Sequence, residues 1–121
     1  MIVDDHAKNV GLIHFYDILR CVTDQSDFSL TIRQLAVVLT CYLFDEDHTV
    51  RGLAARLGLA KTAVSRMLDH LVHEGLLERH ADPRDRRSVL FGRTLTGNSF
   101  LERITRPMPQ PAVRSHRRQR G

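Results

Sequence analysis

A short run of small and hydrogen-bonding side chains follows a glycine turn in the middle of the chain. Its members are Lys61, Thr62, Ala63, Ser65 and Arg66. Ammonium, hydroxyl and guanidinium groups donate hydrogen bonds to base edges and phosphates, and an arginine can hold a guanine edge through two bonds. A helix start at this point would also favour a phosphate through its free amides. These residues indicate DNA recognition in the major groove, because a merely solvated helix face would usually carry more glutamate.

The residues beyond this run predict a β-hairpin with a charged tip. Strand-like stretches run from Leu76 to His80 and from Ser88 to Phe91, and the connection between them carries Arg84, Arg86 and Arg87. A charged tip can serve solubility alone. Three arginines among six residues, next to the expected recognition helix, instead favour contact with nucleic acid.

A helix-turn-helix pattern would position both groups. Ala54, Gly58 and Val64 supply a small residue where two helices touch, a glycine able to adopt positive φ, and an apolar residue that locks the second helix. Thr49 is a good N-cap for the first helix and is also counted among the residues expected to contact DNA, and Gly75 can end the second helix in the left-handed conformation. The spacing therefore predicts two short helices that meet at a glycine turn.

Three further helices are expected around this pair. Residues 9–24 carry an uneven apolar stripe, Thr31 and Gln34 form a capping box that opens a helix through about Phe44, and Thr94 caps a last helix. The core-facing positions expected in the helix after Thr31 follow the helical repeat: Leu35, Val38, Leu39, Tyr42 and Leu43. The fold class predicted is mainly α with a small β-hairpin wing, a winged helix-turn-helix.

The distribution of charge divides the chain. Its formal net charge is +4, but residues 106–121 hold five of the 18 basic residues and none of the 14 acidic ones, so the rest sums to −1. Overall basicity is therefore weak evidence for DNA binding, and local placement must carry the argument. We expect one winged helix-turn-helix domain over residues 1–106 and a basic, disordered tail over 107–121, after Pro107 ends the last helix.

Other residues that could do chemistry have simpler explanations. Cys21 and Cys41 stand far apart among apolar residues, which favours buried thiols over a disulfide or a sensor. His70 and His73 lie one helical turn apart without a third ligand nearby, so a metal site is not expected. The acidic run at residues 45–47 precedes a helix start, where the dipole favours carboxylates. No catalytic motif and no cofactor motif is present, so an enzyme is not expected.

The motifs together resemble the MarR family of bacterial transcription regulators. The likeness is carried by residues 53–79 and by Asp-Pro-Arg-Asp-Arg-Arg at 82–87, and it extends from roughly Leu30 to Ile104. It implies a winged-helix homodimer that binds a near-palindromic operator in double-stranded DNA. By the same resemblance Asp85 would brace the hairpin, through Arg87, while Arg84 or Arg86 would reach into the minor groove.

Two departures from that family are visible. Arg93 stands where members usually have a leucine before the Thr-x-x-Gly that enters the last helix, and the C-terminal helices that build the usual dimer interface are replaced by the basic tail. We therefore expect a homodimer built differently from the usual one.

The function predicted is sequence-specific, DNA-binding regulation of transcription. The N-terminus is acidic, whereas a secretory signal would be basic and then apolar. No run of residues is apolar enough for a membrane span. We therefore expect a cytoplasmic protein without membrane contact. A small-molecule effector, if there is one, has no signal in the sequence. Two alternatives stay open: a winged-helix adaptor for protein interactions, favoured by the near-neutral body, and a plasmid or phage replication or maintenance protein that uses the same fold.

Overall fold

The computed structural model describes residues 6–24 and 28–106, with side chains from residue 9 onward. By contacts the chain divides into two compact units, one of residues 27–100 and one that joins residues 1–26 to 101–121. The expected tail at 107–121 lies outside the described residues. Among those described, no helix is long and apolar enough to cross a membrane.

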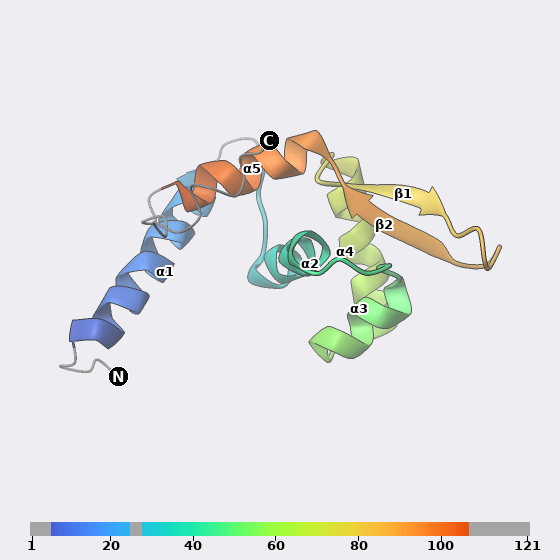
Figure 1. Cartoon of the computed structure of the whole chain (residues 1–121), viewed down its shortest axis with the longest axis horizontal. Helices are drawn as coiled ribbons and strands as arrows, with labels where there is room; N and C mark the ends of the chain where they lie inside the picture. The colour runs from blue at the N-terminus through green and yellow to red at the C-terminus, as the bar shows by residue number, and fades with distance from the viewer. Residues whose placement is uncertain (1–5, 25–27, 107–121) are drawn as a thin grey trace. The chain divides into compact units, whose positions relative to one another are not determined.

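Five helices and one hairpin make up the described chain. Their order is α1 (His6–Asp24), α2 (Ile32–Leu43), α3 (Val50–Leu57), α4 (Lys61–His73), β1 (Leu77–Ala81), β2 (Val89–Arg93) and α5 (Leu95–Thr105). Figure 1 shows α2, α3 and α4 gathered together, with the hairpin extending from them. This is the winged helix-turn-helix that the sequence predicts, with each strand starting one residue later than expected.

The capping box of α2 forms as predicted, but one residue that was expected in the core, Leu43, is exposed. The Thr31 hydroxyl accepts from the Gln34 amide at 3.0 Å, and the Gln34 side chain accepts from the Thr31 amide at 2.9 Å. Leu43, expected in the core, is 69% exposed, whereas Val37 and Cys41 are buried. The helix packs on α3, α4 and β2. Its buried stripe is therefore turned toward these neighbours, and its last residue lies beyond them.

Glycine conformations end both helices of the helix-turn-helix. Gly58 has φ 68°, and the amide of the following Leu59 donates to the Ala54 carbonyl at 3.0 Å. Gly75 ends α4 with φ 82°. An L-residue with a side chain rarely adopts either conformation, so both turns depend on glycine. Val64 is fully buried, as its expected role as the lock of the second helix requires.

The hairpin is tied to the helices along its second strand. The two strands are antiparallel, with Leu77 opposite Arg93 and Ala81 opposite Val89. The Phe91 amide donates to the His48 carbonyl in the α2–α3 loop at 2.9 Å. Since Leu77 and Phe91 are also buried, the base of the wing is part of the core while its tip is exposed.

A hydrogen-bonded junction around Tyr42 fixes both ends of the hairpin. The Tyr42 hydroxyl donates to the Leu76 carbonyl at 2.7 Å and accepts from the Thr94 amide at 2.9 Å. The Thr94 hydroxyl donates to the Gly75 carbonyl at 2.6 Å and accepts from the Gly97 amide at 2.9 Å, which makes Thr94 the N-cap of α5. We call these five residues the Tyr42 junction. It joins α2, the end of α4 and the start of α5.

The arginine that replaces the expected leucine before α5 also finds a partner. Arg93 Nε donates to the Cys41 carbonyl at 3.1 Å. That carbonyl belongs to the last turn of α2, where acceptors lack helical donors and where the helix dipole favours a cation. Arg93 therefore attaches the end of β2 to α2 through a polar contact.

The Tyr42 junction predicts a large cost for a methyl group at Gly97. A Cβ built there would lie 1.7 Å from the Tyr42 hydroxyl and 2.8 Å from the Leu76 carbonyl. We expect Gly97→Ala to lower the free energy of unfolding by about 2–3 kcal/mol, in the range for overpacked sites. Chemical denaturation measures this. The control is Gly11→Ala in α1, where nothing lies within 4 Å and a small stabilisation is expected; equal effects at the two sites would contradict the assignment.

Candidate nucleic-acid interface

Helix α4 separates its buried and exposed residues cleanly. Val64, Leu68 and Leu71 are fully buried. The residues singled out from the sequence lie on the other side: Lys61, Thr62, Ser65 and Arg66 are exposed, and Ala63 is half-buried. The side of α4 that faces solvent in its first two turns therefore carries hydrogen-bond donors and small side chains, the composition that a recognition helix needs.

The start of α4 differs from the starts of α2 and α3. Its N-cap is Ala60, which makes no side-chain hydrogen bond to the helix, whereas Thr31 and Thr49 cap their helices through their hydroxyls. The Thr49 hydroxyl accepts from the Gly52 amide at 3.0 Å. Its own hydrogen stays available to an external acceptor.

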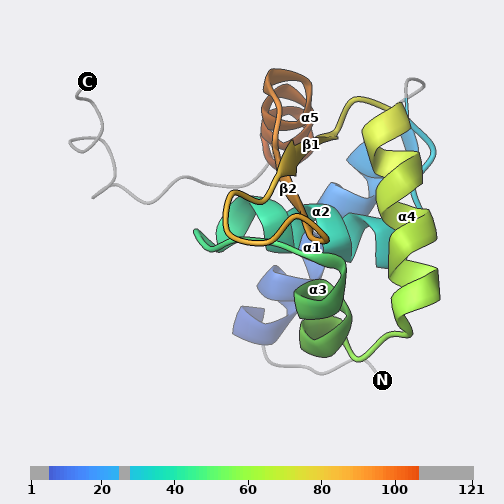
Figure 2. The same cartoon turned by 90° about the vertical axis from the view of Figure 1, so that its right-hand side faces the viewer.

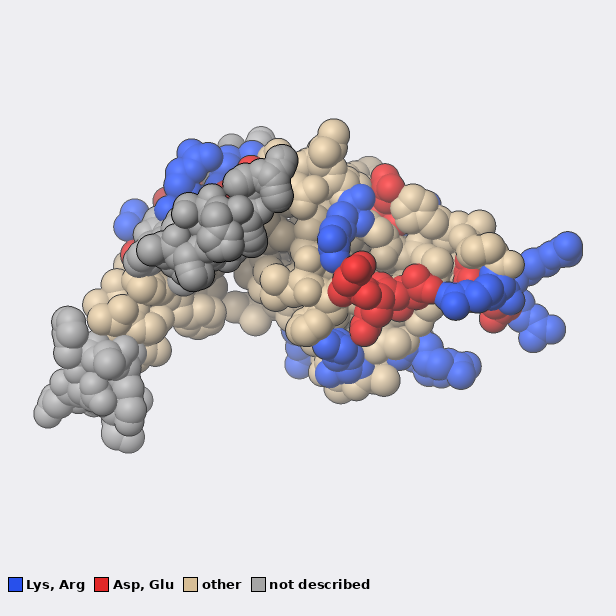
Figure 3. Space-filling model, viewed as in Figure 1, with Lys and Arg blue, Asp and Glu red and all other residues tan. Residues whose placement is uncertain are grey.

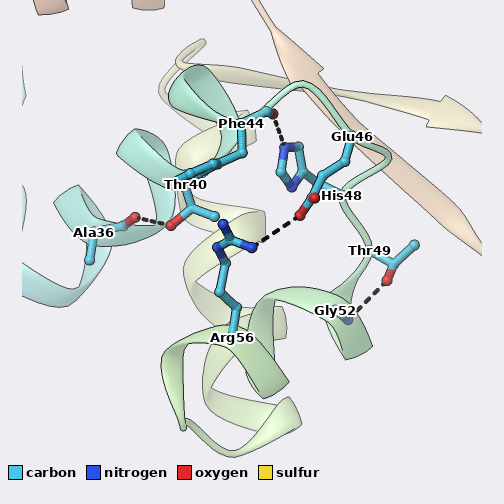
Figure 4. A network of polar contacts seen from close by, with 8 residues as sticks. All are labelled: Ala36, Thr40, Phe44, Glu46, His48, Thr49, Gly52 and Arg56. Carbon is cyan, nitrogen blue, oxygen red and sulfur yellow. Dashed lines mark hydrogen bonds and ion pairs between the residues drawn. The ribbon is translucent and has the colours of Figure 1, made fainter.

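The loop between α2 and α3 is held by a polar network, drawn in Figure 4. His48 is 6% exposed, and its Nε2 donates to the Phe44 carbonyl at 2.8 Å. Arg56 of α3 lies 3.9 Å above the Phe44 ring and 3.4 Å from the Glu46 carboxylate. This network fixes the chain immediately before Thr49. Sequence reasoning missed His48, because a lone histidine after an acidic run gives no sign of the carbonyl that it reaches.

Two aspartates shape the tip of the hairpin through backbone amides. Asp82 accepts from the Arg84 amide at 2.9 Å, and Asp85 accepts from the Arg87 amide at 3.0 Å. The Ser88 amide then donates to the Asp85 carbonyl at 3.0 Å. Asp85 thus contacts the main chain of Arg87 rather than its guanidinium, which leaves that guanidinium available.

The three arginines of the tip have different surroundings. Arg84, whose side chain is 73% exposed, forms ion pairs with Asp47 of the α2–α3 loop and, at 3.8 Å, with Asp82. The side chains of Arg86 and Arg87 have no acidic partner in the described part of the chain. Arg84 is therefore turned toward the body of the protein, and reaching DNA would require it to leave two carboxylates.

Acidic side chains divide the basic residues of this region into two sets. The paired arginines are Arg56, Arg79 and Arg84, whose carboxylate partners are Glu46, Asp69, and Asp47 with Asp82. In α3, α4 and the hairpin tip, five basic residues have no acidic partner among residues 6–24 and 28–106: Arg51, Lys61, Arg66, Arg86 and Arg87. Figure 3 shows acidic side chains gathered beside the hairpin and basic ones at its tip. We call the second set the unpaired cations.

An open cleft of about 580 Å³ lies between the hairpin and the two helices of the helix-turn-helix. Figure 2 shows these three elements from the side on which the hairpin extends. We call it the hairpin cleft, and its lining is Thr49, Val50, Arg51, Lys61, Asp85, Arg87, Ser88 and Val89. Three of the unpaired cations line it. Arg51 was missed from the sequence, where its position two residues after an N-cap was the sole hint of exposure.

The two cysteines differ in burial. Cys41 is buried in α2, and burial raises the pKa of its thiol to about 12 against a smaller lowering by the charge of Arg93. Cys21, expected to be buried, is half-buried. His70 and His73 bring no further ligand, since the described residues hold no group of three or more His, Cys, Asp or Glu side chains placed for a metal ion.

The fold and the exposed cations define a winged-helix DNA-binding protein, and comparisons identify its family. The sequence model of the MarR family matches residues 30–89. The chain belongs to the MarR family and is a DNA-binding transcription regulator. A search of curated protein sequences found no match.

Solved structures agree with this membership. The chain is similar to the transcriptional regulator Tm0710 from Thermotoga maritima, with 26% identity, a TM-score of 0.69, and 83% of this chain and 70% of that chain covered. It is 30% identical to CouR of Rhodococcus jostii RHA1, a transcriptional repressor bound to a 23-mer DNA duplex, over 87% of this chain and 71% of that one, with a TM-score of 0.64. Similarity to the S. aureus MepR–DNA complex, at 21% identity, 84% and 82% coverage and a TM-score of 0.67, shows the fold alone.

The raised pKa of Cys41 predicts selective protection from alkylation. With a pKa of about 12, only about 1 in 10,000 of its thiols is ionised at pH 8, and the thiolate is the nucleophile. We expect iodoacetamide at pH 8 to modify Cys21 in the native protein while Cys41 stays unmodified until the chain is unfolded in guanidinium. Peptide mass spectrometry over time measures both. Modification of the two residues at equal rates in the native protein would contradict this.

Proposed function

We propose that α4 of this regulator lies in the major groove of an operator while the hairpin enters the adjacent minor groove. The observation that carries the proposal is the set of unpaired cations on α3, α4 and the hairpin tip. An unpaired guanidinium at the surface can bind a phosphate or base edge without first giving up a carboxylate. The paired arginines lack this advantage.

Residues of α4 are assigned to base reading in this proposal. Arg66 can bind a guanine edge with two bonds, and Ser65 can bond to a base edge beside it. The small side chains of Thr62 and Ala63 let the helix approach the groove floor closely. Lys61 and the hydroxyl of Thr49 are assigned to backbone phosphates, which fix register without reading sequence.

The hairpin tip is assigned to the minor groove through Arg86, which has no acidic partner among the described residues. A narrow minor groove has an enhanced negative potential that attracts arginine. Arg84 is assigned a different role, since its ion pair with Asp47 links the hairpin tip to the α2–α3 loop. Asp85 is assigned to stabilising the turn, through its hydrogen bond to the Arg87 amide.

We further propose that the protein acts as a homodimer in the cytoplasm. Four large apolar residues of α1 are between 48% and 60% exposed: Leu12, Ile13, Phe15 and Tyr16. A contiguous exposed apolar surface of this kind is typical of an interaction site. Two copies would present two α4 helices to the two halves of a palindromic operator. One structural relative, CouR, is bound to p-coumaroyl-CoA, and a small-molecule effector for this chain forms part of the proposal.

The division between base reading and backbone binding makes a testable prediction. Arg66→Ala is expected to reduce the ratio of operator to nonspecific affinity by about 10-fold, because one bidentate base contact carries about 1–3 kcal/mol of discrimination. Arg86→Ala is expected to weaken binding to the operator and to the scrambled duplex equally, so that the ratio of the two affinities stays at the wild-type value. Fluorescence anisotropy with the protein's own upstream region and a scrambled duplex measures both ratios. Arg79→Ala, which removes a paired arginine, is the control; equal specificity ratios in the Arg66 and Arg86 variants would refute the division.

The dimer proposal predicts a mass of twice 13.9 kDa in solution. Replacing Phe15 by serine removes apolar area from α1 and is expected to shift the protein toward the monomer, seen by sedimentation velocity at micromolar concentration. Leu95→Ser is the matched control, because Leu95 is 85% exposed but lies in α5. A monomeric wild type, or a Phe15 variant that stays dimeric, would speak against dimerisation through α1.

A further inference from the structure

We propose that the hairpin cleft seats one sugar-phosphate strand of the DNA, and that Arg51 contacts a phosphate of that strand. The inference rests on the proposed placement of α4 and the hairpin in neighbouring grooves. It adds a residue that the sequence motif does not contain and assigns the cleft a ligand of defined chemistry, the phosphodiester.

The shape of DNA requires a strand to pass through this region. A major groove and the adjacent minor groove are separated by one sugar-phosphate backbone. A protein that places α4 in the first and the hairpin in the second must straddle that backbone at the saddle between the two elements. The hairpin cleft is an open hollow lined by residues of α4, of the hairpin, and of the start of α3.

The charge of the cleft fits a phosphodiester. Its lining contains Arg51, Lys61 and Arg87 from three different elements and one acid, Asp85. One oxygen of Asp85 already accepts from the Arg87 amide at 3.0 Å. Three cations gathered around one hollow repel each other, and an anion between them relieves that repulsion. Thr49 and Ser88 add hydroxyl groups that can donate to phosphate oxygens.

Arg51 differs from the other arginine of α3 in its surroundings. Arg56 lies over the Phe44 ring at 3.9 Å and beside Glu46 at 3.4 Å. Arg51 is exposed, lines the cleft, and has no ion-pair partner in the residues that the structure describes. Five positions apart in a helix of 3.6 residues per turn, the two side chains leave α3 in different directions. Of the two arginines of α3, Arg56 therefore contacts other residues of the protein, and Arg51 has a side chain available to a ligand.

The experiment measures how DNA affinity depends on salt. Each phosphate neutralised by a protein cation adds about 0.9 to the magnitude of the slope of log K against log salt concentration. With the full chain and labelled operator and scrambled duplexes, from 50 to 200 mM KCl, Arg51→Ala is expected to reduce the slope by about 0.9 on both. Arg56→Ala, the matched control on the same helix, is expected to keep the wild-type slope. Arg51→Lys, which keeps the charge, is expected to restore most of it.

Two results would separate the assignment of Arg51 from the proposed function. A wild type that binds DNA and an Arg51→Ala variant with the wild-type slope would overturn the assignment of Arg51 while leaving the proposed function intact. A wild type that binds neither duplex at low salt would overturn both.

Replacing chloride by inorganic phosphate at constant ionic strength should change wild-type affinity by less than twofold. A larger loss that Arg51→Ala abolishes would overturn the strand seat in favour of a site for the free anion. Circular dichroism of the Arg51 variants is expected to match the wild type, since the side chain is exposed.

Discussion

The position of the hairpin depends on one hydroxyl group. Tyr42 Oη stands between the Leu76 carbonyl, where the chain leaves α4, and the Thr94 amide, where it enters α5. Both ends of the hairpin are therefore hydrogen-bonded to the same atom of α2. Gly97 leaves room for that atom, because any side chain there would occupy its place. Buried polar groups are costly unless they are bonded, so the hydroxyl, the carbonyl and the amide keep one another in register. The base of the hairpin is thereby attached to α2, the helix that also packs on α3 and α4.

Local signals explain why so much of the fold was predictable. Caps at Thr31, Thr49 and Thr94, and the positive φ of Gly58 and Gly75, depend on residues within a few positions of each other. Such features can be read directly from the chain. Element type and order followed from them, and the strand boundaries differed by one or two residues because strand ends are set by pairing across the hairpin.

The parts that could not be predicted depend on residues far apart in sequence. Asp47 and Arg84 are 37 positions apart, and Tyr42 and Thr94 are 52 apart, so no local pattern marks them as partners. The motif names three wing arginines alike, although one is paired with carboxylates. Arg93 is a similar case: it departs from the family pattern, which has a leucine at this position, and in the folded chain its side chain bonds a carbonyl in the last turn of α2. The chain's charges had to be placed in space before their roles could be separated.

The pairing of acids with some arginines and not others has a consequence for the approach to DNA. Carboxylates of the α2–α3 loop neutralise Arg56 and Arg84, while the cations that line the cleft and Arg66 on the exposed side of α4 have no acidic partner among the described residues. The resulting separation of charge gives the region a dipole moment that points its cationic side at a polyanion. At physiological salt this field acts over about 8 Å, the Debye length. Within that range DNA exerts a torque on the protein, so productive orientation begins during the diffusional encounter, before any side chain has made contact.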